Sequence, residues 1–348
     1  MGNRNSRTKS VTPHDDIAAM LSRKLVGQPA AISAIVPYVQ MYRAQLSPEG
    51  RPTGIFLLLG PSGTGKTKTV EALAEVLHGN SKKVLKVDCG EYQMDHEVAK
   101  LTGAPPGYLG HRETQPLLSQ QKLNSVSSAD CDLSIVLFDE IEKAAPSMTR
   151  LLLGVLDKAT LRLGDNTAVN FEKTIIFLTS NLGAREMNKQ LRPEFGFESF
   201  LPLEKSGEHS KLQSIGMRAV RKSFPPEFVN RIDAVVTYEP LDSAALAAIL
   251  EQHVRDLQDH LDRRLGDRTF RVEVPQRSRR FLLEKGVSDE YGARELKRAL
   301  HRLLIQPLAS LVAAGEIDPG AHIRADLDVR KQRLVLREAV DETFQPAC

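Results

Sequence analysis

Residues 60–67 read GPSGTGKT and match the pattern G-x-x-x-x-G-K-[ST] at every fixed position. An apolar run at residues 55–59 comes directly before them, and apolar side chains recur at helical spacing after them. The sequence therefore predicts a strand, a glycine loop and a helix. In this setting backbone N–H groups face phosphate oxygens, Lys66 reaches the β- and γ-phosphates, and the Thr67 hydroxyl binds Mg²⁺. The residues predicted to bind ATP in this loop are Gly60, Pro61, Ser62, Gly63, Thr64, Gly65, Lys66 and Thr67.

Two carboxylates, Asp139 and Glu140, follow a later apolar run at residues 135–138. The carboxyl ends of parallel strands meet at one edge of a sheet, so this pair is expected beside the glycine loop. There Asp139 would orient Mg²⁺, and Glu140 would polarise the attacking water as a general base. The alternative is an acidic surface pair without chemistry. Asn181, just beyond the apolar run at 174–179, either holds the water or γ-phosphate or caps a helix.

Residues 103–110 read GAPPGYLG, and their glycines and Pro-Pro pair predict a loop. Tyr108 and Leu109 stand at its tip. From the residues alone, either Tyr108 fills a gap in its own domain or it is exposed for a function. Residues 184–207 lack sustained periodicity and are predicted to be a long loop or insertion.

The order of these elements indicates an α/β fold with a P-loop large domain, in which helices flank a parallel sheet, and a smaller C-terminal α+β domain. We expect a polar tail and entry helix over residues 1–24, the large domain over 25–238 and the small domain over 239–348. Further local predictions are a hairpin over 161–171, a helix over 91–101 and one continuous helix over 292–313.

Composition argues against several classes of protein. The 348 residues carry a formal net charge of +3 with Lys and Arg dispersed, which is not the footprint of a nucleic-acid binder. No apolar run approaches the roughly 20 residues of a membrane helix, and no secretory signal opens the chain. We therefore expect a cytoplasmic protein with neither a membrane nor a nucleic-acid partner. The cysteines show no metal-binding spacing and are assigned no role.

With these motifs in place, the sequence resembles the AAA+ ATPases of the Clp unfoldase family, and in particular the C-terminal ATPase ring of ClpB and ClpC. The resemblance extends from Leu25 to about Val335. It implies the AAA+ large domain with a C-terminal lid domain. The matching segments, in the family's order, are 60–67, 103–110, 135–144 (IVLFDEIEKA), 179–183 (TSNLG), 226–233 (PEFVNRID) and 291–300 (YGARELKRAL).

The resemblance implies a role for each matching residue. The implied roles are Lys66 and Thr67 as the Walker A pair, Asp139 and Glu140 as the Walker B pair, Asn181 as first sensor, Arg231 as the arginine finger for a neighbouring subunit, Arg294 as second sensor, Val26 and Gly27 at the adenine, and Tyr108 with Leu109 as the pore loop that grips polypeptide. The resemblance also implies ATP and Mg²⁺ as cofactors. It implies a homo-oligomer, a hexameric ring that acts on unfolded or misfolded proteins.

The chain departs from the family pattern in its substrate-handling loops. Residues 111–115 read HRETQ where the family usually has acidic and glycine residues after the pore tyrosine. Residues 159–170 lack the glycine-arginine pairs of the second pore hairpin. Phe195, Gly196 and Phe197 lie where ClpC-like unfoldases carry an apolar tip that docks on the ClpP peptidase. The other interpretation is that Phe195 and Phe197 pack on their own domain.

Three functions are the main alternatives, and a fourth, a nucleic-acid motor, is disfavoured by the dispersed charge. The first is an ATP-dependent unfoldase that threads polypeptide through a single ring. The second is an unfoldase subunit docked on a ClpP-like peptidase. The third is a nucleotide-switched scaffold that does not thread; the altered hairpin favours it, whereas the intact Tyr108, Glu140 and Arg231 argue against it.

Overall fold

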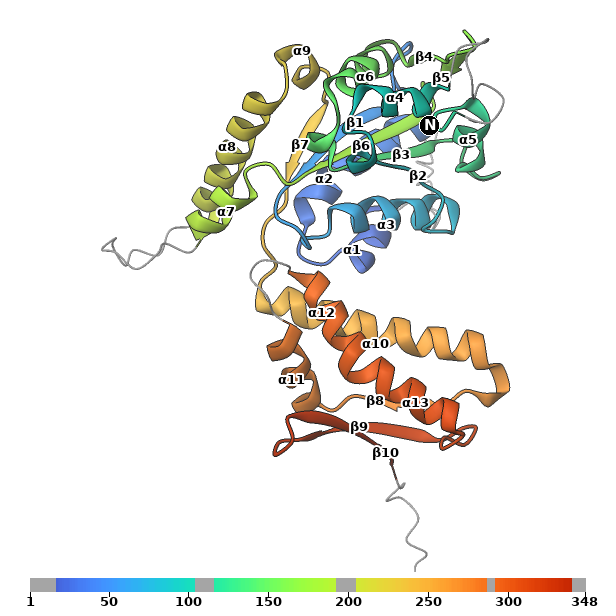
Figure 1. Ribbon diagram of the computed structural model, residues 1–348, viewed down its shortest axis with the longest axis vertical. Coiled ribbons are helices and arrows are strands. Elements are labelled where there is room, and N and C mark those ends of the chain that lie inside the picture. The colour runs from blue at the N-terminus through green and yellow to red at the C-terminus, as the bar shows by residue number, and fades with distance from the viewer. Residues whose placement is uncertain (1–16, 104–115, 192–204, 287–291, 340–348) are drawn as a thin grey trace, which may run out of the picture. The chain divides into compact units, whose positions relative to one another are not determined.

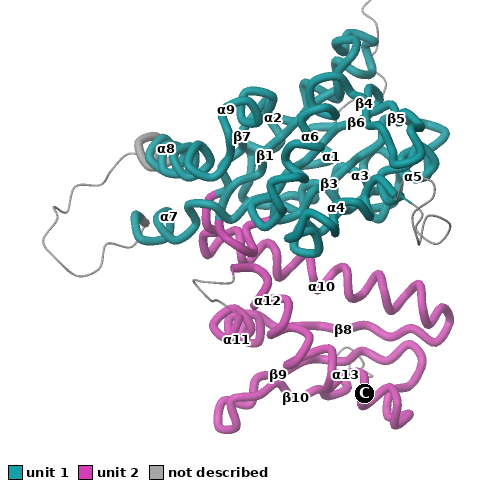
Figure 2. The backbone as a smooth tube through the Cα atoms, turned by 45° about the horizontal axis from the view of Figure 1, so that its top comes forward, with its two compact units in different colours: residues 1–60, 66–190, 194–238 teal, residues 61–65, 191–193, 239–348 magenta. Residues whose placement is uncertain are grey.

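The computed structural model describes residues 17–103, 116–191, 205–286 and 292–339. The chain divides into two compact units, coloured separately in Figure 2. The first unit comprises residues 1–60, 66–190 and 194–238, and the second comprises 61–65, 191–193 and 239–348. Nowhere in the described part of the chain is a helix both long and apolar enough to cross a bilayer.

Parallel strands form the centre of the first unit (Figure 1). Within its described residues they make one five-stranded sheet in the order β2-β3-β6-β1-β7. The strands are β1 (Gly54–Leu59), β2 (Leu85–Asp88), β3 (Ser134–Asp139), β6 (Thr174–Ser180) and β7 (Ala234–Thr237). In β1 and β6 every residue is buried, as expected for parallel strands covered on both faces. The predicted α/β fold is confirmed.

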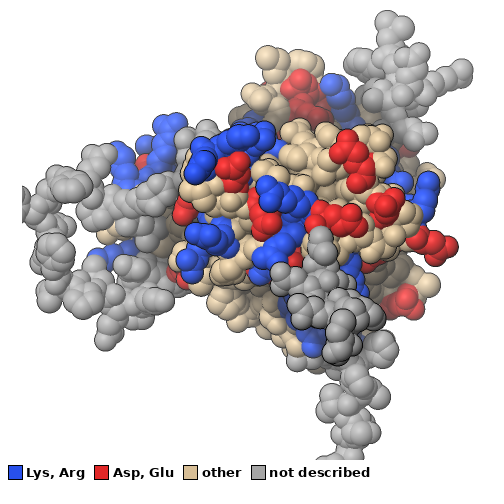
Figure 3. Space-filling model, turned by 90° about the horizontal axis from the view of Figure 1, so that it is seen from below, with Lys and Arg blue, Asp and Glu red and all other residues tan. Residues whose placement is uncertain are grey.

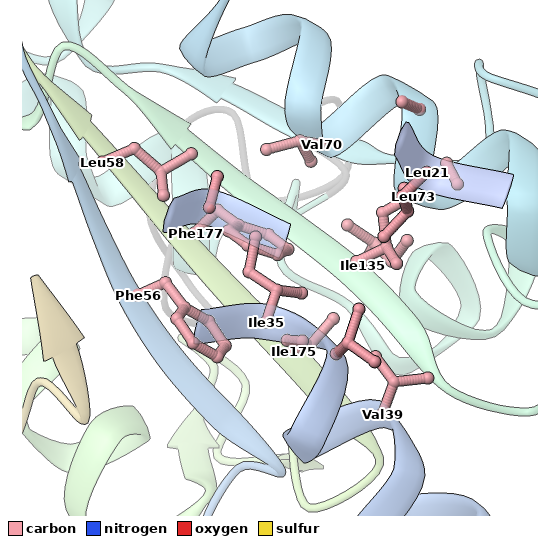
Figure 4. Packing of buried hydrophobic residues seen from close by; sticks show 14 of the residues in the cluster. Leu21, Ile35, Val39, Phe56, Leu58, Val70, Leu73, Ile135, Ile175 and Phe177 are labelled. Carbon is pink, nitrogen blue, oxygen red and sulfur yellow. The ribbon is translucent and has the colours of Figure 1, made fainter. Parts of the chain in front are cut away.

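Helices cover this sheet and connect its strands. They are α1 (Ile17–Lys24), α2 (Pro29–Arg43), α3 (Lys66–His78), α4 (Asp95–Thr102), α5 (Gln120–Ser125), α6 (Pro146–Lys158), α7 (Ala184–Leu191), α8 (Lys205–Ser223) and α9 (Pro226–Val229). Side chains of α1, α2 and α3 share one buried cluster with β1, β3 and β6. Figure 4 shows Ile35 and Val39 of α2 facing Phe56, Ile175 and Phe177 of the sheet. The rings of Phe56 and Phe177 stack with centroids 5.4 Å apart.

A short hairpin follows α6. Its strands, β4 (Thr160–Arg162) and β5 (Ala168–Asn170), pair antiparallel, with Leu161 opposite Val169. The hairpin predicted over residues 161–171 is therefore confirmed.

Two predictions of local structure in the first unit are corrected. The helix predicted over 91–101 begins only at Asp95, because the Asp88 carboxylate accepts from the Gly90 amide and holds residues 89–91 in a 3₁₀ turn. Residues 184–191, predicted as loop, form α7. This helix buries Met187, and a Cβ built on Gly216 of α8 would lie 2.8 Å from the Met187 Cε. Packing against α8 thus stabilises a helix whose own apolar pattern is weak.

The second unit packs helices on a small sheet. Its elements are α10 (Ser243–Leu265), β8 (Arg271–Glu273), α11 (Gln276–Gly286), α12 (Ala293–Leu300), α13 (Gln306–Ala314), β9 (His322–Asp328) and β10 (Arg333–Glu338). In its described residues three strands pair in the order β10-β9-β8, with β9 antiparallel to β10 and parallel to β8. Leu250, Phe281 and Leu296 lie in its core. On the face shown in Figure 3, acidic and basic side chains are interspersed.

The continuous helix predicted over residues 292–313 is interrupted. A π-helical turn, His301–Ile305, separates α12 from α13. Pro307 stands in the first turn of α13, where it has no N–H to donate to the preceding turn. The change of helical register accommodates that missing hydrogen bond.

Gly286 provides a test of packing in the second unit. A Cβ on Gly286 would lie 2.8 Å from the Cα and 2.7 Å from the Cδ1 of Leu296. Gly286→Ala should lower the free energy of unfolding by about 1–3 kcal/mol, because α12 must shift to make room. The control is Gly154→Ala in α6, where the nearest atom is the Thr160 oxygen at 3.6 Å; it should gain about 0.5–1 kcal/mol. Urea unfolding followed by circular dichroism measures both, and equal effects would contradict the packing.

Candidate nucleotide-binding site

The predicted site residues of the first unit follow three neighbouring strands. Gly60 comes directly after β1, and Asn181 comes directly after β6. Asp139 is the last residue of β3, and Glu140 follows it. These strands are adjacent in the sheet and parallel, so their carboxyl ends lie at one edge. The fold thereby brings together residues that are far apart in sequence, at the kind of sheet edge where α/β proteins bind ligands.

Lys66, the first residue of α3, is held at this edge by oxygen atoms. Its Nζ donates to the Gly60 carbonyl at 2.6 Å and to the Asn181 Oδ1 at 2.9 Å. The residue is only 9% exposed, so its charge is largely removed from water and depends on such partners. Thr67 follows in the same first turn and is half-buried. The cation is therefore preorganised at the carboxyl end of β1.

Asp139 is an ionised carboxylate fixed on both oxygens. Its Oδ2 pairs with the Lys86 Nζ at 2.6 Å, and its Oδ1 accepts from the Thr179 Oγ1. Burial raises the pKa of Asp139, but the hydrogen bonds from Lys86 and Thr179 outweigh burial and bring the pKa below its ordinary value. A carboxylate held in its charged form is the kind of oxygen ligand that Mg²⁺ prefers.

Glu140 has a left-handed backbone, with φ 57°, which is uncommon for a residue with a side chain. Its amide donates to the Thr179 Oγ1 at 3.0 Å. Its Oε1 accepts from the Asn181 Nδ2 at 3.3 Å, and its Oε2 pairs with the Lys143 Nζ at 2.5 Å. Strained backbone of this kind is often found at functional sites, and here it presents the Glu140 carboxylate to the Asn181 amide.

Asn181 connects the cation to the carboxylate. Its Oδ1 accepts from Lys66, its Nδ2 donates to Glu140, and its backbone amide donates to the Glu142 Oε1 at 2.9 Å. The Asn181 side chain thus joins Lys66 to Glu140. From the sequence alone, a role for Asn181 as a helix cap was an equally good interpretation.

Four residues in this network were not singled out from the sequence: Lys86, Glu142, Lys143 and Thr179. Glu142 and Lys143 lie inside the segment IVLFDEIEKA and Thr179 begins TSNLG, so a signal for them existed. Lys86 lies on the exposed side of β2, where alternation alone indicates a solvated lysine.

The glycine loop leaves room on one side. Gly65 has φ 104°, and a Cβ built on it meets no atom of the described chain within 4 Å. At Gly60, by contrast, a Cβ would lie 2.6 Å from the Tyr238 carbonyl oxygen. The Thr64 Oγ1 donates to the Pro61 carbonyl at 2.9 Å. Open space beside glycines that also precede a helix is what a phosphate group requires.

Residues 61–65 are grouped with the second unit, in which the Ala293 amide donates to the Gly63 carbonyl at 3.2 Å. Gly292, with φ 50°, approaches the same carbonyl, and a Cβ there would lie 3.0 Å from it. The neighbouring Arg294 is exposed in the first turn of α12. Gly292 and Ala293 therefore contact the glycine loop, and Arg294 is the next residue along the chain.

The remaining predicted site residues lie on other elements or outside the described residues. Val26 and Gly27 form the turn between α1 and α2. Arg231 follows α9, and its side chain contacts Glu227 and Asp157. The predicted site residues outside the described ranges are Tyr108, Leu109, Phe195, Gly196 and Phe197.

The donor set fits a magnesium ion that arrives with a nucleotide. Among the described residues no three His, Cys, Asp or Glu side chains converge as a metal site. Mg²⁺ needs six oxygen ligands and usually takes only one or two from carboxylates, with the rest from phosphates and water. Asp139 and the Thr67 hydroxyl are the protein groups that would hold it.

A separate hollow of about 450 Å³ lies at the opposite end of the strands. Its lining includes Cys131 and Asp132, just before β3, and Lys173, just before β6. Tyr42 donates to Asp132 across it at 2.5 Å. None of the predicted site residues lines this hollow.

Thr179 supplies a prediction on the network itself. Thr179→Val removes the hydroxyl that bonds both Asp139 and the Glu140 amide, and should cost about 1–3 kcal/mol of folding free energy at pH 7. Because the pKa of Asp139 is depressed in the folded state, this contribution is present above its unfolded pKa and is lost as the pH falls through the folded pKa. The difference from wild type should therefore shrink on acidification. Urea unfolding at several pH values, with exposed Thr160→Val as control, checks this; a pH-independent difference would contradict it.

Comparison with known proteins finds a matching family model for each unit. A family model described as AAA domain (Cdc48 subfamily) matches residues 51–235, and a model of the C-terminal D2-small domain of ClpB protein matches residues 241–325. The chaperone protein ClpB of Corynebacterium efficiens is 35% identical over 307 residues, which cover 88% of this chain and 32% of that protein. The ATP-dependent Clp protease ATP-binding subunit ClpC of Staphylococcus aureus is 33% identical over 327 residues, which cover 94% of this chain and 38% of that protein.

Solved structures agree with these matches. The S. cerevisiae Hsp104:casein complex in its extended conformation superposes with a TM-score of 0.78 at 28% identity, covering 94% of this chain and 53% of that one. A closed state of Hsp104 with ATPγS and FITC-casein gives a TM-score of 0.76 at 29% identity, covering 92% and 51%. The chain thus spans about a third of the length of its curated relatives and about half of these structures.

Proposed function

We propose a function on the premise that this chain belongs to the AAA ATPases of the Clp family, as the two family models and the ClpB and ClpC relatives establish. The proposed function is ATP-driven remodelling of proteins, in which a ring of identical copies, a hexamer in our proposal, unfolds other polypeptides in the cytoplasm. The observation that carries it is the network from Gly60 through Lys66 and Asn181 to Glu140, with Asp139 beside it.

Hydrolysis would use the network as follows. Lys66 lies at the glycine loop and binds the β- and γ-phosphates. Asn181 is hydrogen-bonded to both Lys66 and Glu140 and so fixes their positions relative to each other. Mg²⁺, held by Thr67 and Asp139, would neutralise phosphate charge. Glu140 accepts the proton of a water whose oxygen attacks the γ-phosphorus, and the bond from that phosphorus to the ADP oxygen breaks. Arg231 of an adjacent copy stabilises the charge that develops.

Mechanical work would come from the loop that carries Tyr108 and Leu109. An aromatic ring beside an aliphatic side chain holds extended polypeptide by shape and apolar contact, largely irrespective of sequence. Arg294, next to the residues that contact the glycine loop, would report nucleotide state to the second unit. The similarity to Hsp104 solved with casein supports a protein substrate.

The proposal predicts nucleotide-dependent capture of polypeptide. Fluorescence anisotropy of FITC-labelled casein should rise on adding wild-type protein with ATPγS, and Tyr108→Ala should weaken this binding at least tenfold, the effect of losing about 1.4 kcal/mol at an aromatic anchor. The control is Leu46→Ala, which removes a side chain 70% exposed on the first unit. Equal binding by wild type and Tyr108→Ala would contradict the proposal and favour a nucleotide-switched scaffold.

A second candidate couples the same motor to a peptidase. It is favoured by the similarity to ClpC, which is named as a subunit of a protease, and by Phe195, Gly196 and Phe197 in the expected position. Deleting residues 195–197 should then abolish degradation in the presence of a ClpP-type peptidase and leave ATP hydrolysis intact. Unchanged degradation would rule out docking through this tip.

A further inference from the structure

The side chain of Arg231 makes one hydrogen bond and one ion pair within its own subunit. Its Nη1 donates to the Glu227 carbonyl at 2.6 Å, and its Nε lies 3.3 Å from the Asp157 Oδ1. The Nε atom is shielded from solvent and has no hydrogen-bond partner in the described part of the chain, so its contact with Asp157 is an ion pair. Of the whole Arg231 side chain, 30% is exposed. In the described part of the chain these contacts involve Nη1 and Nε, which leaves Nη2 for a partner outside the subunit.

Local structure does not account for an aspartate at position 157. Asp157 is the penultimate residue of α6, where a negative charge opposes the helix macrodipole, and aspartate has a low helix propensity. Its neighbours Val155 and Leu156 are buried and fix the last turn of α6 in the core, while 47% of the Asp157 side chain is exposed. A residue that breaks a local rule in this way calls for a compensating contact, and Arg231 is that contact.

We propose that Asp157 is a positioning residue for Arg231, and that it aims the guanidinium at ATP bound by the adjacent copy. This inference rests on the proposed function, in which Arg231 acts between subunits. A free arginine side chain samples many rotamers, and ordering it costs conformational entropy. Asp157 and the Glu227 carbonyl restrict that freedom before the neighbouring nucleotide is met.

The proposal separates catalysis from stability. Ion pairs as exposed as this one contribute little to folding, so Asp157→Ala should unfold at nearly the same urea concentration as wild type. A misplaced catalytic group can nevertheless cost about 100-fold in rate. We expect kcat for ATP hydrolysis to fall roughly 10- to 100-fold with nucleotide affinity unchanged. Asp157→Asn, which keeps the shape, should show the same loss, and Asp157→Glu should recover part of the rate.

Subunit mixing distinguishes positioning in the adjacent copy from a defect within the subunit. Asp157→Ala protein is mixed with excess Glu140→Gln protein, which has lost its own base but keeps Arg231 and Asp157. In a mixed oligomer, a Glu140→Gln subunit supplies an unaltered Arg231 and Asp157 to the ATP site of an adjacent Asp157→Ala subunit, which keeps its own Glu140. Phosphate release per Asp157→Ala subunit should then rise toward the wild-type value. Arg231→Ala protein mixed in the same way is the reference. The control is Asp267→Ala, at an exposed site in the second unit, which should hydrolyse ATP like wild type before mixing.

The outcomes are distinct. Rescue of both Arg231→Ala and Asp157→Ala supports the proposal. Rescue of Arg231→Ala alone, or a wild-type kcat for Asp157→Ala, overturns the role of Asp157. Either result leaves the proposed action of Arg231 between subunits intact. Failure to rescue Arg231→Ala overturns the action of Arg231 between subunits, and with it the basis of this inference.

Discussion

Glu140→Gln is expected to lower kcat for ATP hydrolysis by about 10²- to 10⁴-fold while ATP still binds. The amide keeps an oxygen that can accept from the Asn181 Nδ2, so the arrangement around Asn181 should survive. It cannot accept the proton of the attacking water, which is the step assigned to Glu140. Phosphate release and the affinity for a fluorescent ADP analogue measure the two effects separately.

A matched substitution outside the site controls for the change of charge. Glu75 lies on α3 and forms an ion pair with Lys24 at 2.8 Å. The Glu75 side chain is 38% exposed. Glu75→Gln should therefore hydrolyse ATP like wild type. If Glu140→Gln retained more than a tenth of the wild-type kcat, another group would have to serve as the base.

Lys66→Met should weaken ATP binding by roughly 30- to 5,000-fold, which corresponds to about 2–5 kcal/mol for removing one partner of a buried charge pair. The Nζ of Lys66 lies 2.6 Å from the Gly60 carbonyl oxygen and 2.9 Å from the Asn181 Oδ1, which place its charge at the glycine loop. Methionine fills the volume of the stem but carries no charge. Titration with a fluorescent nucleotide measures the dissociation constant.

Lys68→Met is the control for this substitution, because Lys68 is exposed on the same helix two residues later. It should bind nucleotide within about twofold of wild type, as expected for a rim charge. Equal affinity for Lys66→Met and wild type would show that the loop does not bind phosphate through this lysine.

The elements that carry the site were predictable because their signals are local. The apolar runs predicted at 135–138 and 174–179 became β3, Ser134–Asp139, and β6, Thr174–Ser180. Both strands are buried on each face, so composition alone distinguishes them from their surroundings. Their polar ends then placed Asp139, Glu140 and Asn181 at one edge of the sheet.

The bonds between those residues could not be predicted. Thr179 bonds Asp139 across 40 residues, and Lys66 bonds Asn181 across 115. Such contacts depend on strand register, which a single sequence leaves open. The pairing of Arg231 with Asp157 is of the same kind, because it joins the end of α6 to the turn after α9. Likewise α7 forms because Met187 packs beside Gly216, a contact that its own eight residues do not encode.

The central claim is that ATP hydrolysis at this site drives the unfolding of other proteins. The most direct test is the ATP-dependent loss of fluorescence from a tagged, folded reporter protein, with wild type compared with Glu140→Gln and Tyr108→Ala. We predict that wild type unfolds the reporter and that both variants fail, Glu140→Gln for lack of hydrolysis and Tyr108→Ala in spite of it. Hydrolysis of ATP by wild type without unfolding of several reporters would contradict the claim and indicate a nucleotide switch.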